Sequence, residues 1–569
     1  MIKSASTDDR LGDYTADTRL IFLAAVAALI GVTSAFVALA LVRLIGLFTN
    51  LAYFHRLSTS FASPAASPLS AWRALIPVGG GLIVGLMARY GSERIRGHGI
   101  PEALEAILIG RSRMDPKVAV LKPLSSALAI GTGGPYGAEG PIIVTGGAFG
   151  SLFGQALHLS AAERKTLLVA GAAGGMTAIF ATPVAAVLLA LELLLFEWKP
   201  RSFIPVASAA AVAGVLRVPL FGAGPLFPVV PHPALSWTPV AALGVGLAAG
   251  LVATALTALL YGCEDLFAML PFHWMWWPAI GGVFVGLGGL IAPRALGVGY
   301  DVIRDLLAGR LVGTTLIVLL VVKALIWAIG LGSGTSGGLV APLLLMGSAL
   351  GALGAGVFHA ADPSLWVMLG MAALMGGTMQ IPFTALVFAV ELTGDLAALP
   401  ALLIACVAAA GVTVLLMRRS ILTEKLARRG RHLTREYGVN PLHVLRVEDV
   451  MEPPLTPPPA VLPVLTYPDE LLETAMRKLL EHEVEVLPVA SPDDPSRVIG
   501  YVERAAILAA WVQHTRDEAV QEEGWLPRLR KAPPPPPPPP ASASPPPWPP
   551  RSRRGGTSDT SSSCRAGCA

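Results

Sequence analysis

The stretch Gly137-Ala138-Glu139-Gly140-Pro141 lies inside a long apolar, glycine-rich region and determines how the rest of the chain is interpreted. Between Lys122 and Glu163 the only formal charge is that of Glu139. A lone carboxylate in a membrane-grade segment is costly and therefore indicates a functional site. The glycines before it and the proline after it predict a loop that runs into the first turn of a helix. Because helix N-termini present free N–H groups and a positive dipole end, we expect an anion site at this helix start.

The composition indicates an integral membrane protein. Hydrophobic residues make up 53% and charged residues 14% of the 569 residues, whereas roughly 25% of the residues of a soluble domain are charged. The 60 glycines favour closely packed and broken membrane helices. The net charge of +4 gives no sign of a nucleic-acid partner. The cysteines Cys263, Cys406, Cys564 and Cys568 lack metal-ligand spacing, so we expect no metal site. We also expect no enzyme activity and no cofactor.

Apolar segments alternate with short Gly/Pro breaks from about Leu20 to Met417. Several are too short for a simple span of about 20 residues, as expected where helix ends line a binding site inside the bilayer. We predict a mainly α, polytopic membrane domain over residues 19–430, preceded by a cytoplasmic tail over residues 1–18. The apolar run after that tail is predicted to be an uncleaved first span, because no cleavage signal precedes it.

Three sequence blocks recur in the same order in the second part of the chain, which predicts two homologous membrane halves at about 70–200 and 275–400. The residues alone leave open whether the halves are parallel or inverted. Transporters built from such halves bind substrate near the bilayer midplane, where broken helices from both halves meet. The matching blocks are Gly97-His98-Gly99-Ile100-Pro101 with Gly297-Val298-Gly299-Tyr300-Asp301, Lys122 to Pro141 with Lys323 to Pro342 at a constant offset of 201, and the blocks that begin at Pro183 and Pro382.

The two halves differ at one critical position. The offset of 201 places Val340 opposite Glu139, so only one of the two predicted helix starts carries a negative charge. An ionised Glu139 would occupy the anion site, and a protonated one would leave it. This predicts a gate that is sensitive to pH and to anion concentration. The alternative is a structural glutamate that caps the helix through backbone N–H groups, and the residue pattern leaves both open.

The blocks GHGIPEALEAI, GAEGPIIVTGG, GGLVAPLL and SILTEKLARRG resemble the signature blocks of the CLC family of chloride channels and anion/proton antiporters. The resemblance extends from about Thr18 to Gly430, in the family's order and spacing. It implies inverted repeats, a homodimer with a separate anion pathway in each subunit, and Glu139 as the gate. Backbone N–H groups of Leu339 and Val340 would line the central anion site. The candidate anion-binding residues are His98, Gly99, Ile100, Gly137, Gly140, Gly338, Leu339, Val340 and Leu422.

The chain departs from the family's pattern at two of these positions. His98 stands where the family usually has serine or, in some members, proline. Its imidazole could donate an N–H to an anion, more strongly if protonated; the alternative is a helix-capping side chain turned away from the pore. Leu422 stands where the family commonly has a tyrosine whose hydroxyl touches the anion, which predicts a weaker or purely steric inner constriction. The preference among chloride, nitrate, bromide and fluoride stays open.

A third departure concerns proton coupling. Antiporters of the family usually have a second, inward-facing glutamate directly after the one that ends a helix. Here Leu193 follows Glu192, and the counterpart Glu391 is also followed by leucine, so both glutamates are interpreted as symmetric structural residues. Glu197 could substitute as proton acceptor, although a solvated helix-end charge is favoured. We predict a passive or loosely coupled anion pathway, with a fully proton-coupled antiporter as the alternative.

The sequence after the last membrane helix changes in character. After a linker at residues 431–445, residues 446–512 resemble a small cytosolic α/β CBS domain, with an amphipathic helix at 469–483, two strand-like segments and a final helix. One unit is present, so pairing across a dimer is expected, and an assembly role is favoured over adenine-nucleotide binding. Residues 513–569 predict a disordered, Pro-rich tail. The positive-inside bias places this end in the cytoplasm, because basic residues follow the last helix at Lys425, Arg428, Arg429, Arg431 and Arg435.

These features together predict the transport of chloride, or of another inorganic anion, across a plasma or inner membrane, with both termini cytoplasmic. A second class of function is a membrane ion sensor that signals through the CBS-like domain. It is disfavoured because both halves keep the helix-start glycines that a pathway needs. A cation or amino-acid carrier would need acidic or carbonyl-rich ligands at the broken helices, whereas this chain offers N–H groups and a single acid.

Overall fold

The computed structural model describes residues 18–519 apart from residues 69–70, 109–111, 158, 233–237, 361, 430–441, 443–444 and 454–463. The predicted tail before Thr18, most of the predicted linker, and the Pro-rich segment from residue 520, with Cys564 and Cys568, lie outside the described residues. The chain divides into two compact units, Met1–Tyr437 and Gly438–Ala569, called here the membrane unit and the C-terminal unit.

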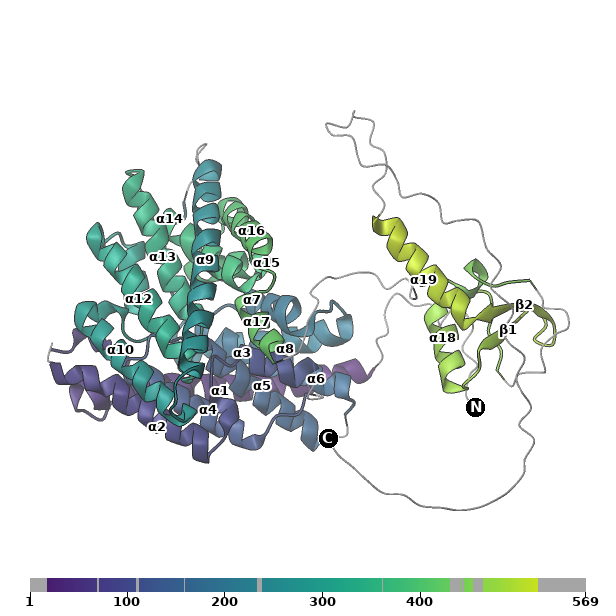
Figure 1. The fold of residues 1–569 in the computed structure, drawn as a ribbon, viewed down its shortest axis with the longest axis horizontal. Coiled ribbons are helices and arrows are strands. Elements are labelled where there is room, and N and C mark those ends of the chain that lie inside the picture. The colour runs from purple at the N-terminus through teal and green to yellow at the C-terminus, as the bar shows by residue number, and fades with distance from the viewer. Residues whose placement is uncertain are drawn as a thin grey trace, which may run out of the picture. The chain divides into compact units, whose positions relative to one another are not determined.

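The described part of the membrane unit is helical, and eight of its helical segments are long and apolar enough to cross a membrane (Figure 1). Other helices, such as α7 and α11, are too short to do so. The mainly α fold predicted from the composition is therefore confirmed. The helices are α1 (Arg19–Phe54), α2 (Ile76–Tyr90), α3 (Ile100–Leu108), α4 (Pro116–Gly131), α5 (Glu139–Ala156), α6 (Ala161–Phe180), α7 (Pro183–Leu189), α8 (Pro200–Phe221), α9 (Thr238–Ala268), α10 (Trp277–Ile291), α11 (Tyr300–Leu307), α12 (Thr314–Gly332), α13 (Val340–Val357), α14 (Pro363–Met379), α15 (Pro382–Thr393), α16 (Leu399–Leu416) and α17 (Ile421–Arg428).

The helices α2 to α8 of the first half correspond in order to α10 to α16 of the second half. The helix α5 packs on α6 as α13 packs on α14, and α1 packs on α8 as α9 packs on α16. Glycines make these contacts close: a Cβ added to Gly146 would meet the carbonyl oxygen of Gly171 at 2.3 Å, and one added to Gly347 would meet that of Gly370 at 2.3 Å. Because small residues let membrane helices approach closely, the sequence repeat is also a repeat of packing.

Two equivalent residues of the halves also pair with each other. Gly137 and Gly338 exchange two backbone hydrogen bonds, of 3.1 and 2.8 Å, in an antiparallel bridge. The equivalent helices α2 and α10 likewise pack directly against each other. A residue that bonds to its own counterpart in both directions lies next to an approximate two-fold axis. The two halves are therefore related by an axis that passes between Gly137 and Gly338.

The two glutamates interpreted as structural residues cap helices of the opposite half. Glu391 accepts the backbone N–H groups of Val184 and Ala185 at 3.0 and 2.8 Å, at the start of α7. Glu192 accepts the backbone N–H and the hydroxyl of Thr384 at 2.9 and 2.6 Å, at the start of α15. Carboxylates stabilise helix starts by pairing N–H groups that lack a partner within the helix. The structural interpretation of both residues is confirmed.

The C-terminal unit contains the predicted helix, strand pair and final helix. These are α18 (Leu472–Glu481), β1 (Val486–Ala490), β2 (Val498–Glu503) and α19 (Arg504–Ala519). The strands β1 and β2 form an antiparallel sheet in which Pro488 lies opposite Tyr501. The apolar faces of the helices and the sheet meet in a small core that includes Val447, Leu472, Leu479, Leu487, Val502 and Ile507.

Candidate anion-binding site

The loops that precede α5 and α13 bring two helix starts together. The helix α5 begins at Glu139 and α13 at Val340, the two positions that the repeat offset matched. The loops are joined by the backbone pair of Gly137 and Gly338. A Cβ added to Gly338 would lie 2.9 Å from the backbone nitrogen of Gly140. Since the first N–H groups of a helix have no partner within it, this junction gathers helix-start donors from both halves.

The first repeat block joins the same junction. Gly97 pairs with the loop before α13. The carbonyl oxygen of His98 lies 1.9 Å from the place of a Cβ on Gly140, which only glycine leaves free. Gly99 has a φ of +92°, a conformation that favours glycine, and a Cβ there would meet the carbonyl oxygen of Gly140 at 2.9 Å. The start of α3, at Ile100, therefore lies beside the start of α5.

Two buried lysines hold the loops of the repeat blocks. Lys122 Nζ donates to the carbonyls of Ile95 and Gly97 at 2.8 and 2.7 Å. Lys323 Nζ donates to the two counterpart carbonyls before α11 at 2.9 and 2.8 Å. In the sequence, these lysines were only the first residues of two matching repeat blocks, and no role was predicted for them. A lone lysine at the same place in two apolar helices was the signal that could have identified them, because a buried ammonium needs partners.

The fully buried side chain of Glu139 folds back over its own loop. Its Oε2 lies 1.6 Å from the place of a Cβ on Gly137 and 2.8 Å from that of a Cβ on Gly338, and it has no hydrogen-bond partner among the described residues. The backbone N–H groups of Glu139 itself and of Ala341, in the first turns of α5 and α13, lie close enough to act on the carboxylate. The hydroxyl of Tyr300 donates to Oε1 at 3.4 Å. The carboxylate thus lies at the helix start of the opposite half, where an anion would bind.

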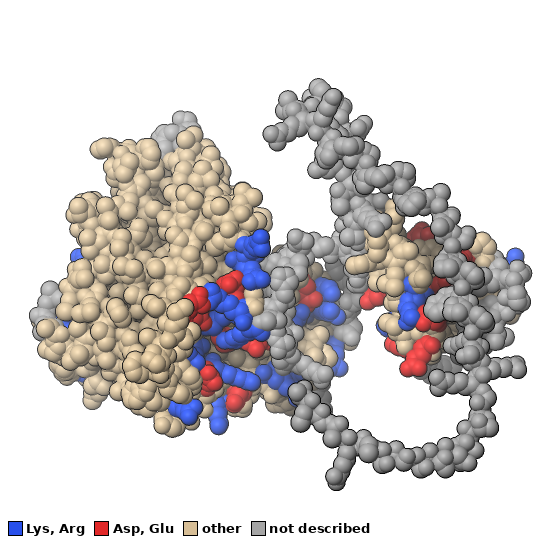
Figure 2. All heavy atoms as spheres, viewed as in Figure 1, with Lys and Arg blue, Asp and Glu red and all other residues tan. Residues whose placement is uncertain are grey.

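A cavity with charged lining residues lies near His98, because Glu102 and Lys425, which act on His98, line it. The His98 side chain is buried, and its Nδ1 has no hydrogen-bond partner among the described residues. Glu102 and Lys425, whose side chains lie 3.8 Å apart, act electrostatically on it. Both also line a cavity of about 960 Å³ together with Arg96 and Arg429. Figure 2 shows charged side chains of the membrane unit gathered in one region, while most of the rest of the visible face is uncharged.

Leu422 is fully buried on α17, which packs against α3. The carbonyl of its neighbour Ile421 accepts the hydroxyl of Tyr261 at 2.5 Å, and this bond fixes α17 to α9. Leu422 itself can present only hydrocarbon to an anion. The hydroxyl that the family pattern would place on α17 is therefore missing, and the hydroxyl of Tyr261 is already used by the backbone.

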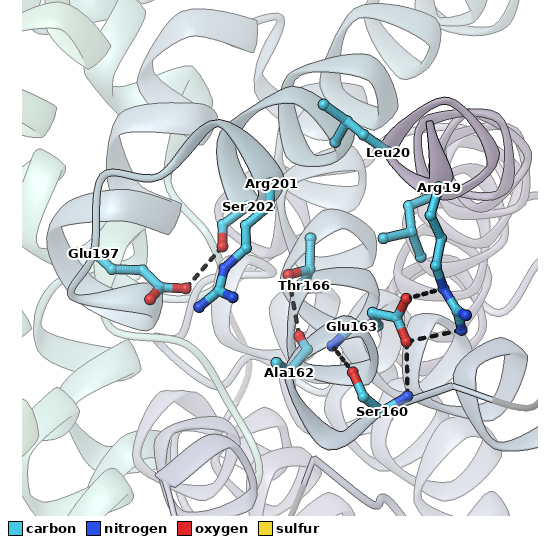
Figure 3. A pocket seen from close by; sticks show the side chains of 10 residues that line it. Arg19, Leu20, Ser160, Ala162, Glu163, Thr166, Glu197, Arg201 and Ser202 are labelled. Atoms are coloured by element: carbon cyan, nitrogen blue, oxygen red, sulfur yellow. Dashed lines mark hydrogen bonds and ion pairs between the residues drawn. The ribbon is translucent and has the colours of Figure 1, made fainter. Parts of the chain in front are cut away.

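Glu197 lies in a different pocket, shown in Figure 3. Its carboxylate contacts Lys165 at 3.3 Å and Lys199 at 3.6 Å and accepts the hydroxyl of Ser202 at 2.7 Å. The pocket, of about 380 Å³, is lined by residues near the starts of α1, α6 and α8. The structure thus brings together the candidates at the helix starts, whereas Glu197 is engaged with two lysines and a serine elsewhere.

A further cavity lies beside Phe227, whose ring contacts Tyr300. It measures about 570 Å³ and is lined by Phe227, Arg304 and Ser364, among others. The ring of Phe227 meets that of Tyr300 edge to face, with centroids 5.8 Å apart. Tyr300 thus contacts a residue of this cavity through its ring and Glu139 through its hydroxyl. The sequence matched Tyr300 only to Ile100 of the first half and gave no sign of its contact with Glu139.

Comparison with known proteins gives consistent results. A family model described as voltage gated chloride channel matches residues 80–414. A voltage-gated ClC-type chloride channel ClcB of Yersinia pestis is 32% identical over 376 residues, which cover 63% of this chain and 88% of that protein. A ClcB of Citrobacter koseri is 28% identical over 387 residues, or 66% and 92% of the two chains.

Solved structures share the fold. A slow cyanobacterial Cl−/H+ antiporter matches with a TM-score of 0.64 and 22% identity, covering 73% of this chain and 99% of its own. A CLC-type fluoride/proton antiporter matches with a TM-score of 0.60 and 22% identity, covering 72% and 98%. At these identities the likeness concerns the arrangement of the helices.

Proposed function

Because this chain belongs to the voltage gated chloride channel family, we propose that it carries chloride across the membrane along a path that Glu139 gates. The two ClcB relatives are named as chloride channels, and the two solved structures are anion/proton antiporters. The observation that carries the proposal is the carboxylate of Glu139 at the start of α13. A carboxylate and a permeating anion cannot both occupy that position, so the side chain must leave for the anion to pass.

The proposed path runs through the helix starts. It begins in the charged cavity beside Lys425, passes His98 and reaches the junction of Gly140 and Gly338. There the N–H groups of Gly99, Ile100, Leu339 and Val340, at the starts of α3 and α13, would line the path. Leu422 would limit its width with hydrocarbon alone. Beyond Glu139 it passes Tyr300 and opens into the cavity at Phe227. The proposed path has a cavity at each end, one beside Lys425 and one at Phe227. This arrangement supports a pathway rather than a closed ion-sensing site.

The assembly is proposed from the family. We propose a homodimer in a plasma or inner membrane, with one anion path in each subunit, inverted halves and cytoplasmic termini. The approximate two-fold axis between Gly137 and Gly338 supports related halves in each subunit. The C-terminal unit, as a CBS-like domain, would pair across the dimer and serve assembly.

Proton coupling is expected to be loose. At the position of the family's inner proton glutamate, Leu193 is fully buried in the π-helical segment Ala190–Leu195. Glu197 is held by two lysines and a serine in its own pocket. We expect full-length protein in liposomes to release chloride down its gradient while moving few protons, measured with a chloride electrode and a pH electrode in the same sample.

The matched variant for this experiment is Glu197→Gln. It should leave both fluxes as in the wild type. Stoichiometric proton pumping by the wild type that is lost in Glu197→Gln would instead establish the fully coupled antiporter, an alternative supported by the fold that the chain shares with antiporters. The absence of chloride release above that of protein-free liposomes would contradict the proposed transport itself.

A further inference from the structure

A tyrosine of the second half meets the carboxylate of Glu139. Tyr300 is the first residue of α11, and its hydroxyl donates to Glu139 Oε1 at 3.4 Å. The counterpart of Tyr300 in the first half is Ile100, which has no hydroxyl. Glu139 likewise has no acidic counterpart, because Val340 takes its place in the second half. The contact is therefore not repeated by the equivalent residues of the two halves. Both members of the pair are specific to one side of the two-fold axis.

Aromatic rings fix the position of this hydroxyl. The Tyr300 ring meets Phe180 and Phe227 edge to face, with centroids 6.3 and 5.8 Å apart. Phe180 in turn meets Phe388 at 5.2 Å, and all three phenylalanines are buried. Edge-to-face pairs restrict the rings to a few orientations. The hydroxyl is thus part of a fixed aromatic frame that the Glu139 carboxylate contacts.

We propose that Tyr300 is a positioning residue whose hydroxyl holds the ionised Glu139 side chain in the closed position. The inference rests on the proposed function and adds a residue to its gate. The donor matters more here than in a site rich in hydroxyls, because His98 and Leu422 provide none. It strengthens the closed state only while the carboxylate is charged, since a hydrogen bond to a charged group is stronger than one to a neutral group.

Other charged groups around this contact have partners of their own. Glu102 pairs with Lys425, and Lys122 and Lys323 donate to loop carbonyls. Within the described residues no ion pair joins any of these groups to Glu139. The hydroxyl of Tyr300 is therefore the side-chain partner through which the closed carboxylate is held. The charged or titratable residues on the elements packed against α5 and α13 include His98 and Glu102 at α3, Lys122 on α4, Asp301 and Arg304 on α11, and Lys323 on α12.

The test is chloride efflux from liposomes containing the full-length protein, measured over a pH series with potassium clamped by an ionophore. In Tyr300→Phe the closed state loses its donor while the ring and its packing remain. Efflux at the alkaline end should rise roughly threefold to tenfold, and the midpoint of the flux–pH curve should move up by roughly half to one pH unit, as expected for a single hydrogen bond of ordinary strength. Phe227→Leu, which loosens the ring but keeps the hydroxyl, should shift the midpoint in the same direction by less.

The matched control is Tyr53→Phe, which also removes one buried hydroxyl bond, here to the carbonyl of Thr132, and should leave the midpoint in place. The decisive arm repeats Tyr300→Phe in a Glu139→Gln background, where it should change the flux–pH curve no further. An unshifted midpoint in Tyr300→Phe, or an equal effect in both backgrounds, would overturn the inference. Absence of efflux in the wild type would overturn the proposed function instead, so the two failures are distinguishable. Size-exclusion elution and thermal unfolding are measured for each variant to establish that it is folded.

Discussion

Replacing Gly140 by alanine is expected to reduce chloride efflux about tenfold or more in protein that still folds. The added Cβ would lie 1.9 Å from the carbonyl oxygen of His98 and 3.3 Å from the Cα of Gly338. Backbone atoms must shift to accept it, at a cost of about 1–3 kcal/mol. This shift separates the starts of α3, α5 and α13, and each 1.4 kcal/mol lost in anion stabilisation at the junction corresponds to about tenfold in affinity.

Gly244→Ala provides the matched control, because a Cβ at this position on α9 meets nothing within 4 Å. It should keep wild-type efflux. Both variants are measured for efflux in liposomes and for thermal unfolding in detergent. Wild-type efflux in Gly140→Ala would show that an anion does not pass the junction at all.

The second large effect is expected for Glu139→Gln, which keeps the shape of the side chain and removes its charge. Efflux should become nearly independent of pH and should exceed that of the wild type about tenfold at alkaline pH. The reason is that the ionised carboxylate binds the backbone donors at α13 more strongly than a neutral amide, and a hydrogen bond to a charged group contributes about 1.5–3 kcal/mol. The amide therefore competes poorly with chloride for Ala341 and its neighbours.

The control for this variant is Glu197→Gln, which removes a carboxylate outside the path and should keep the pH dependence of the wild type. The contrary result is informative too. If Glu139→Gln retains the wild-type pH dependence and merely lowers thermal stability, Glu139 is a helix cap and the gate lies elsewhere. The residue pattern left these two roles open, and the buried Oε2 without a partner is the structural feature that favours the gate.

Much of the site could be predicted because its signals are local. The glycines and the proline around Glu139 specify a loop and a helix start in any fold, and the structure begins α5 at that residue. The constant offset to Val340 then located the second helix start, since homologous segments fold alike. The isolated acid could be identified from the sequence of its segment alone, because charged residues are rare in apolar segments.

What the sequence could not provide depends on tertiary packing. Tyr300 lies 161 positions from Glu139 and became its partner only through the two-fold arrangement of the halves. Likewise Glu192 was predicted to be structural, but its partner Thr384 belongs to the other half. Neither pairing leaves a local pattern, since neither requires a particular spacing along the chain.

The central claim is that chloride and the Glu139 carboxylate compete for the same helix-start donors, and equilibrium chloride binding as a function of pH tests it most directly. Calorimetric titration of the purified full-length protein should give an affinity that weakens steadily from acid to alkaline pH, and Glu139→Gln should show one affinity throughout. Wild-type affinity that stays the same across the pH range, in protein whose efflux still depends on pH, would contradict the account.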